Sequence, residues 1–128
     1  MYIAKGAVLD LGGSTVEFNS IAGAGTVRNG TVKVAKLKIN VDEGALIFDN
    51  AILESGRKIV DLGRTSENPL VEQKEVYDVC TFTSSLPSLT GWKVQNTGLE
   101  EVKGVFFAEG DTVKVQLMPA GGFHIILR

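Results

Sequence analysis

The sequence has few of the residues that build cross-links and metal centres. Its 128 residues include a single cysteine, Cys80, and a single histidine, His124. One cysteine cannot form an internal disulfide, and one cysteine with one histidine falls short of the four ligands of a structural zinc site. Stability is therefore expected to come from packing and backbone hydrogen bonds, and no metal or cofactor is expected.

Net charge and long apolar runs are also scarce. Thirteen basic and fifteen acidic residues leave a net charge of -2, which offers no electrostatic attraction to nucleic acid or to an anionic membrane. The longest apolar runs, such as residues 45–48 and 125–127, are far shorter than the roughly 18 residues of a membrane-spanning helix. We expect neither a nucleic-acid partner nor membrane insertion.

The chain instead contains many short runs that favour β-strands, rich in Val, Ile, Leu, Thr and Phe. No window of twelve residues in the first half keeps the 3.6-residue apolar period of a helix, so the sequence predicts an all-β protein. The predicted strands are residues 7–11, 15–18, 25–27, 31–39, 45–48, 51–53, 58–62, 75–82, 92–95, 102–107, 112–117 and 123–127.

Glycine, asparagine and aspartate separate the early runs, because they adopt the positive φ angles of tight turns. The predicted turn residues are Gly12, Gly13, Gly25, Asn29, Gly30 and Gly44. Asn29-Gly30 is typical of a two-residue hairpin, which would pair residues 25–28 with 31–34 in a β-sandwich or jelly roll. The alternative is a β-solenoid, in which each strand pairs in parallel with the strand one turn later.

A regular spacing of glycines favours the solenoid only weakly. Gly6, Gly25, Gly44 and Gly63 recur every 19 residues, but with 15 glycines in the chain such a ladder can arise by chance. Residue identities carry more weight. The elements Leu9-Asp10-Leu11-Gly12-Gly13, Gly23-Ala24-Gly25-Thr26-Val27 and Asn29-Gly30 resemble the autotransporter-associated β-strand repeats of bacterial autotransporter passenger regions. The strand Val76 to Phe82, with the Ser/Leu/Pro-rich link and Gly91-Trp92-Lys93-Val94 after it, is similar to the end of such passengers.

This resemblance implies a right-handed parallel β-helix that acts as a stalk, adhesin element or scaffold in an exported or surface-associated bacterial protein. We therefore expect one domain over residues 1–128, with solenoid coils at 6–62, a loop at 63–74 and antiparallel capping strands at 75–128. Residues 1–6 lack the basic start and apolar core of a signal peptide. The expected location is the cell surface or the exterior if the chain is part of an exported protein, and the cytoplasm otherwise.

The expected function is structural and non-enzymatic: an assembly or surface-adhesion module that self-associates, because the end of a solenoid exposes unpaired backbone groups. A homo-oligomer is the expected partner, with a glycan or surface partner as a further candidate. The alternative function is a carbohydrate-binding β module. In that case Trp92, Phe106 and Phe107 would form a sugar-stacking platform, whereas in the solenoid they would cap the core.

Enzymatic chemistry has weak candidates only. A Cys80–His124 dyad would need a thiolate and a positioned base, yet both residues fall in predicted strands. Adjacent acidic residues at 42–43 and 100–101 point to opposite faces of a strand or lie in turns, which suits glycoside cleavage poorly. Acidic and basic groups on one strand face could serve a polysaccharide lyase; these are Asp10, Glu17, Arg28 and Lys33.

Overall fold

The computed structural model describes residues 1–64, 76–96 and 102–119, and all regular structure within these ranges is β. The prediction of an all-β protein is confirmed. Ten strands form one mixed sheet: β1 (Tyr2–Ile3), β2 (Val8–Asp10), β3 (Thr15–Gly23), β4 (Thr26–Asn40), β5 (Leu46–Leu53), β6 (Lys58–Gly63), β7 (Val76–Phe82), β8 (Trp92–Asn96), β9 (Val102–Glu109) and β10 (Thr112–Pro119). The described residues hold no helix with the length and apolarity needed to span a membrane.

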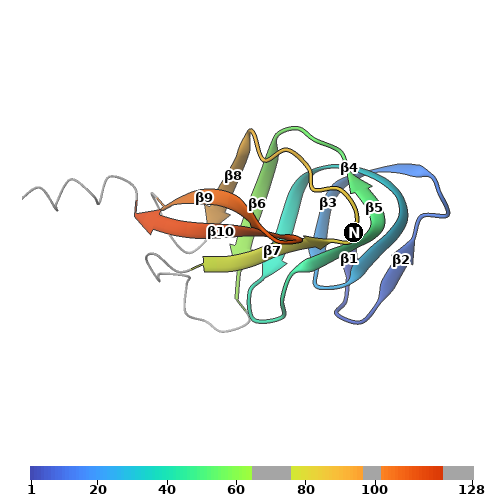
Figure 1. Ribbon diagram of the computed structural model, residues 1–128. Helices are drawn as coiled ribbons and strands as arrows, with labels where there is room; N and C mark the ends of the chain where they lie inside the picture. The colour runs from blue at the N-terminus through green and yellow to red at the C-terminus, as the bar shows by residue number, and fades with distance from the viewer. Residues whose placement is uncertain (65–75, 97–101, 120–128) are drawn as a thin grey trace, which may run out of the picture.

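Parallel pairing between segments far apart in sequence dominates this sheet. Strands β2 and β3 both pair in parallel with β4, which pairs in parallel with β5 and β6 on its other side. Strand β5 pairs in the same sense with β7, and β6 with β8. Figure 1 shows the result: the blue first strands lie at one end of the molecule and the orange and red strands β9 and β10 at the other. We call the successive segments 2–23, 26–40, 46–63 and 76–96 the first to fourth layers.

Register places apolar residues of successive layers in three rows that form the core. One row is Leu9, Val27, Phe48 and Phe82; a second is Val16, Val32 and Leu53; a third is Ile21, Leu37, Val60 and Val94. The rings of Phe48 and Phe82 stack with their centroids 5.0 Å apart. Burying apolar area in this way is the main stabilising contribution, at about 25 cal/mol per Å².

Long strands bend at corners, and the burial pattern locates the bends. Side chains on one face of a straight strand are an even number of residues apart. In β4, however, Val27 and Val32 are both buried, as are Val34 and Leu37, so the strand turns between the members of each pair. Asn29 lies at the first of these bends with a φ of 58°, and Asn50 lies at the equivalent bend of β5 with a φ of 49°.

The hairpin at Asn29-Gly30, which belonged to the alternative β-sandwich fold, is not formed. Residues 26–28 pair in parallel with β2 and β5, while residues 31–34 pair in parallel with β3, so the two segments belong to one bent strand. The glycine spacing does not give the register either: Val27 pairs with Leu9 and Phe48, and Leu46 pairs with Cys80. Layers of unequal length explain why a constant period fails.

The boundary predicted at residue 62 also needs correction, because parallel stacking continues through β7 and β8. Among the described strands, only β9 and β10 are purely antiparallel; they pair with each other, and β10 also pairs with β7. A bulge lies opposite Val113 and Lys114, so that Val79 and Cys80 are both buried in β7. Most of the predicted loop at 63–74 and the strand at 123–127 fall outside the described residues.

Candidate functional site

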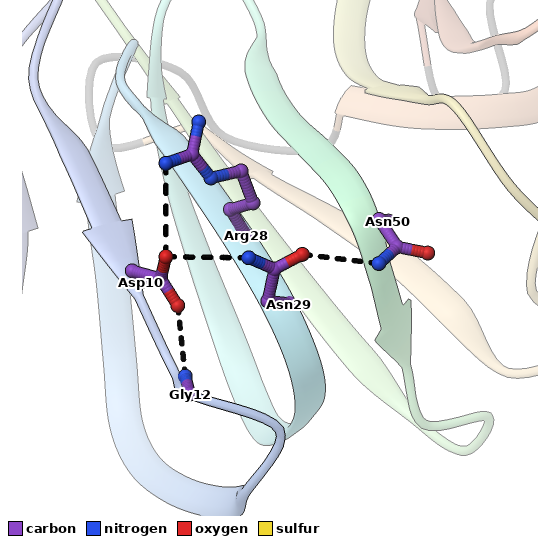
Figure 2. A network of polar contacts seen from close by, with 5 residues as sticks. All are labelled: Asp10, Gly12, Arg28, Asn29 and Asn50. Carbon is purple, nitrogen blue, oxygen red and sulfur yellow. Dashed lines mark hydrogen bonds and ion pairs between the residues drawn. The ribbon is translucent and has the colours of Figure 1, made fainter.

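A ladder of polar side chains follows the corner where β2, β4 and β5 turn. Asn29 Nδ2 donates to Asp10 Oδ2 at 3.2 Å, and Asn50 Nδ2 donates to Asn29 Oδ1 at 3.0 Å (Figure 2). The backbone N–H of Asn50 continues the ladder by donating to Thr83 Oγ1 at 2.7 Å. Both asparagines have left-handed φ angles, which their short polar side chains tolerate better than other non-glycine residues do. The ladder therefore connects all four layers at one corner.

Asp10 begins the ladder and is held from three sides. Its Oδ1 accepts the Gly12 amide at 2.8 Å, and its Oδ2 lies 3.6 Å from Arg28 Nη2. The hydrogen bond from Gly12, followed by contributions from Asn29 and Arg28, lowers the pKa of the Asp10 carboxyl from its ordinary value of 3.8. This carboxylate is thus ionised at neutral pH, and it accepts two hydrogen bonds and forms one ion pair within the fold.

The predicted turn glycines have two different roles. Gly12, Gly13 and Gly44 have positive φ angles of 61°, 82° and 119°, which glycine adopts without steric penalty. Gly25 and Gly30 are needed for space instead. A Cβ at Gly30 would lie 2.5 Å from the Ser14 carbonyl oxygen, and one at Gly25 would lie 2.6 Å from that of Ala4.

Of the three candidate aromatic residues, the structure brings two together. Trp92 is 7% exposed, and its indole meets the Phe106 ring edge to face with centroids 5.6 Å apart. Phe107 is next to Phe106 on β9, so its side chain points to the opposite face of the strand. Burial leaves little of the Trp92 ring available for stacking on a sugar, and the Trp92–Phe106 contact joins the fourth layer to β9.

The candidate catalytic groups are not arranged as a reaction centre in the described ranges. Cys80 is fully buried, and burial raises the pKa of its thiol, which disfavours the nucleophilic thiolate. Asp42 and Glu43 lie in the turn after β4. His124 and the acidic pair at 100–101 lie outside the described residues. Within residues 1–64, 76–96 and 102–119, no cluster of three potential metal ligands occurs.

The four residues considered for lyase chemistry form two separate structural pairs. Asp10 forms an ion pair with Arg28, as given above, at one corner of the fold. Glu17 lies beside Lys33 in the β3–β4 register, on a different segment of the bent strands. Lys33 also lies 3.9 Å from Glu54 Oε2. Each basic group therefore has an acidic neighbour, and the four do not converge on one surface.

The first layer has an open edge. Thr26 N donates to Ala7 O, and Leu11 N donates to Arg28 O, so by strand alternation the backbone groups of Val8 and Asp10 point away from β4. The same reasoning applies to Thr15 and Glu17, because Thr31 N donates to Ser14 O. Within the described part of the chain, no strand pairs with this side of residues 8–10 or 15–18.

Two functional features were missed at the sequence level. Asn50 extends the corner ladder, and its signal was the sequence Asn50-Ala51, a second asparagine before a small residue, as in Asn29-Gly30. Lys58 is 4% exposed, although lysine is rarely buried. Its signal was strand alternation: Lys58 precedes Val60 by two residues and Leu62 by four, so all three side chains share the inward face of β6. Comparisons with known proteins found no matching family model, curated protein or solved structure.

Proposed function

We propose that this chain is a structural module, a short right-handed parallel β-helix closed at one end by an antiparallel hairpin, whose open first layer pairs with a second copy. Parallel pairing of successive layers, three apolar rows and a polar ladder at a left-handed corner all support the β-helix. The resemblance of residues 9–34 to autotransporter-associated repeats supports the same architecture. It also favours a role at a bacterial surface, as an adhesin element or scaffold.

The observation that carries the assembly proposal is the incomplete burial of the first layer. Val27 and Val32 in the second layer are 0% exposed. Their first-layer counterparts Leu9 and Val16 are only partly buried, and Val8 beside them is 51% exposed. These apolar groups lie next to backbone groups that no described strand pairs with. An edge of this kind is a template for another strand, because one contact satisfies the hydrogen bonds and covers the apolar surface together.

We favour a second copy of the chain as the occupant, because a two-fold axis lets the same edge serve both partners and closes the assembly at a dimer. Light scattering coupled to size exclusion, over a dilution series, tests this. The wild-type protein is expected at twice 13.7 kDa. Val8→Pro should shift it to the monomer, because the Val8 amide points away from β4 and its loss leaves the native hydrogen bonds intact.

A matched pair of lysine substitutions provides the control. Val8→Lys places a charge on the edge strand β2. Ile47→Lys places a charge at the corresponding outward position of β5, which is paired with β4 on one side and with β7 on the other. We expect only Val8→Lys to weaken the dimer. A wild-type monomer at every concentration, or dimers of unchanged affinity in both Val8 variants, would disprove the proposed edge contact.

The carbohydrate-binding alternative based on Trp92, Phe106 and Phe107 has less support. An aromatic platform for sugars needs an exposed ring face, and the Trp92 ring is mostly covered. Trp92 and Phe106 fit better as residues that close the end of the solenoid, since Trp92 is in register with Lys58 of the third layer and contacts Phe106 of the hairpin.

A further inference from the structure

A cleft of about 360 Å³ lies where β3 and β4 bend, bounded by the loop at residues 54–57 and the start of β6. Its volume is at the lower end of the range for small-molecule sites, about 300–1,000 Å³. Glu17 and Phe18 come from β3, Lys33 from β4, and the loop contributes Glu54 and Arg57. The cleft lies a few residues further along the strands than the corner ladder and includes none of the ladder residues.

Lys58 also lines this cleft and is its unusual member. The side chain is 4% exposed and lies on the inward face of β6 with Val60 and Leu62. In the described part of the chain, the Lys58 ammonium group makes no hydrogen bond or ion pair, and it keeps contact with solvent although the rest of the side chain is buried. Burial lowers the pKa of Lys58, and the nearby Glu54 carboxylate opposes that effect.

The charges around Lys58 explain why it lacks a strong partner. Glu54 lies 3.9 Å from Lys33 Nζ, so this carboxylate is already shared with another cation. Glu17 lies beside Lys33 in the strand register. The cleft therefore holds three cations, Lys33, Arg57 and Lys58, against two carboxylates. One positive charge is left over, and the most buried of the three cations carries it.

We propose that this cleft binds an oxyanion, a carboxylate, sulfate or phosphate group, with the Lys58 ammonium as its principal partner. An ammonium offers three donors and no acceptor, and hydrogen bonds between ions are about twice as strong as neutral ones. Arg57, on the loop beside it, adds a planar donor group suited to oxyanions. The anion would supply the counter-charge that the fold does not.

The oxyanion has two sources, a free inorganic ion or an acidic group carried on a ring. The half-buried Phe18 side chain in the cleft wall offers an apolar surface to a ring but not to a free ion. Titrations with sulfate, with glucuronate and with glucose at constant ionic strength therefore separate the sources. Tighter binding of glucuronate than of sulfate indicates a ring-bearing ligand, the reverse order indicates a free ion, and glucose is expected not to bind.

Trp92 is the only tryptophan and is in register with Lys58, so its fluorescence reports on the cleft. We expect saturable anion-dependent fluorescence changes in the wild type and at least tenfold weaker binding in Lys58→Met, which keeps the aliphatic stem and removes the charge. Lys93→Met, an exposed lysine on β8 outside the cleft, is the control and should bind as the wild type does.

A second readout does not depend on fluorescence. The pKa of Lys58, followed by NMR of the carbon next to its ammonium group, should rise when the anion binds, because a negative partner favours the protonated form. Lys58→Met should also unfold at higher denaturant concentration than the wild type in the absence of anions. Anion binding equal in Lys58→Met and wild type, no saturable response to either anion, or a Lys58 pKa that does not move would each overturn the proposal.

Discussion

Replacing Asn29 tests whether the polar corner ladder stabilises the stacked layers. Its side chain donates to Asp10 at 3.2 Å and accepts from Asn50 at 3.0 Å, and its backbone has a φ of 58°. Two substitutions separate these effects. Asn29→Gly removes both side-chain hydrogen bonds and keeps the left-handed backbone accessible, whereas Asn29→Ala removes the bonds and adds steric strain.

The expected magnitudes follow from these two differences. Losing two solvent-exposed hydrogen bonds costs about 1 kcal/mol in total, at the low end of the usual range for each. Alanine in the left-handed region costs about 1–2 kcal/mol. Against this, alanine loses about 0.5–1 kcal/mol less backbone entropy on folding than glycine does. We expect Asn29→Gly to lower the free energy of unfolding by about 1 kcal/mol and Asn29→Ala by about 2 kcal/mol.

Urea unfolding, followed by the fluorescence of Trp92, measures both values if the slope of free energy against denaturant is unchanged. If the Asn29→Ala variant is at least as stable as the Asn29→Gly variant, the left-handed backbone at residue 29 does not have the expected cost. Wild-type stability in Asn29→Gly would show that the ladder bonds contribute nothing. The double variant Asn29→Gly/Asn50→Gly isolates the bond between the two side chains, for which we expect a coupling of about 0.5 kcal/mol.

Two further substitutions and one control test other parts of the fold. Asp10 has a lowered pKa, so its contribution to stability is present above the ordinary pKa of 3.8 and is lost as the pH falls through the lower pKa of the folded state. The stability difference between wild type and Asp10→Asn should therefore shrink in acid. A difference independent of pH would contradict this. Gly25→Ala should destabilise the protein by about 2 kcal/mol, because the new Cβ would meet Ile3 Cγ2 and lie 2.6 Å from Ala4 O. Gly63→Ala has open space around it and should be neutral in the same unfolding assay; equal effects at the two glycines would show that the contact with the first strand is unimportant.

The sequence located most strands because alternation and β-branched residues act locally. It could not decide how the strands are joined. Asn29-Gly30 has the same local chemistry in a hairpin and in a bent strand, since both need a left-handed residue followed by a small one. The deciding information is which distant segment lies alongside. Residues 25–27 and 31–39 were predicted as two strands, and they merge into β4 because neighbouring layers pair with both halves.

The glycine ladder failed for a related reason. Gly25 is required by the close approach of Ile3 and Ala4, Gly44 by a φ of 119°, and Gly63 by neither. These equally spaced glycines therefore have unrelated structural roles. Lys58 shows a different limit: its alternation with Val60 and Leu62 is the signal of an inward lysine, but no prediction was made from it. What remained hidden was that its neighbouring carboxylates are engaged elsewhere, a property that depends on strands far apart in the sequence.

The open edge and the oxyanion cleft share Glu17 and Phe18, and this overlap links the two proposals. The backbone of Glu17 points toward the open edge, while Glu17 and Phe18 line the cleft. A second copy seated along residues 15–18 would therefore contact one wall of the anion site. If an anion changes the affinity between the two copies by some factor, then dimerisation must change the affinity for that anion by the same factor. If the contact is confined to residues 8–10, the two equilibria are independent, so the presence or absence of this coupling reports which part of the edge the copies use.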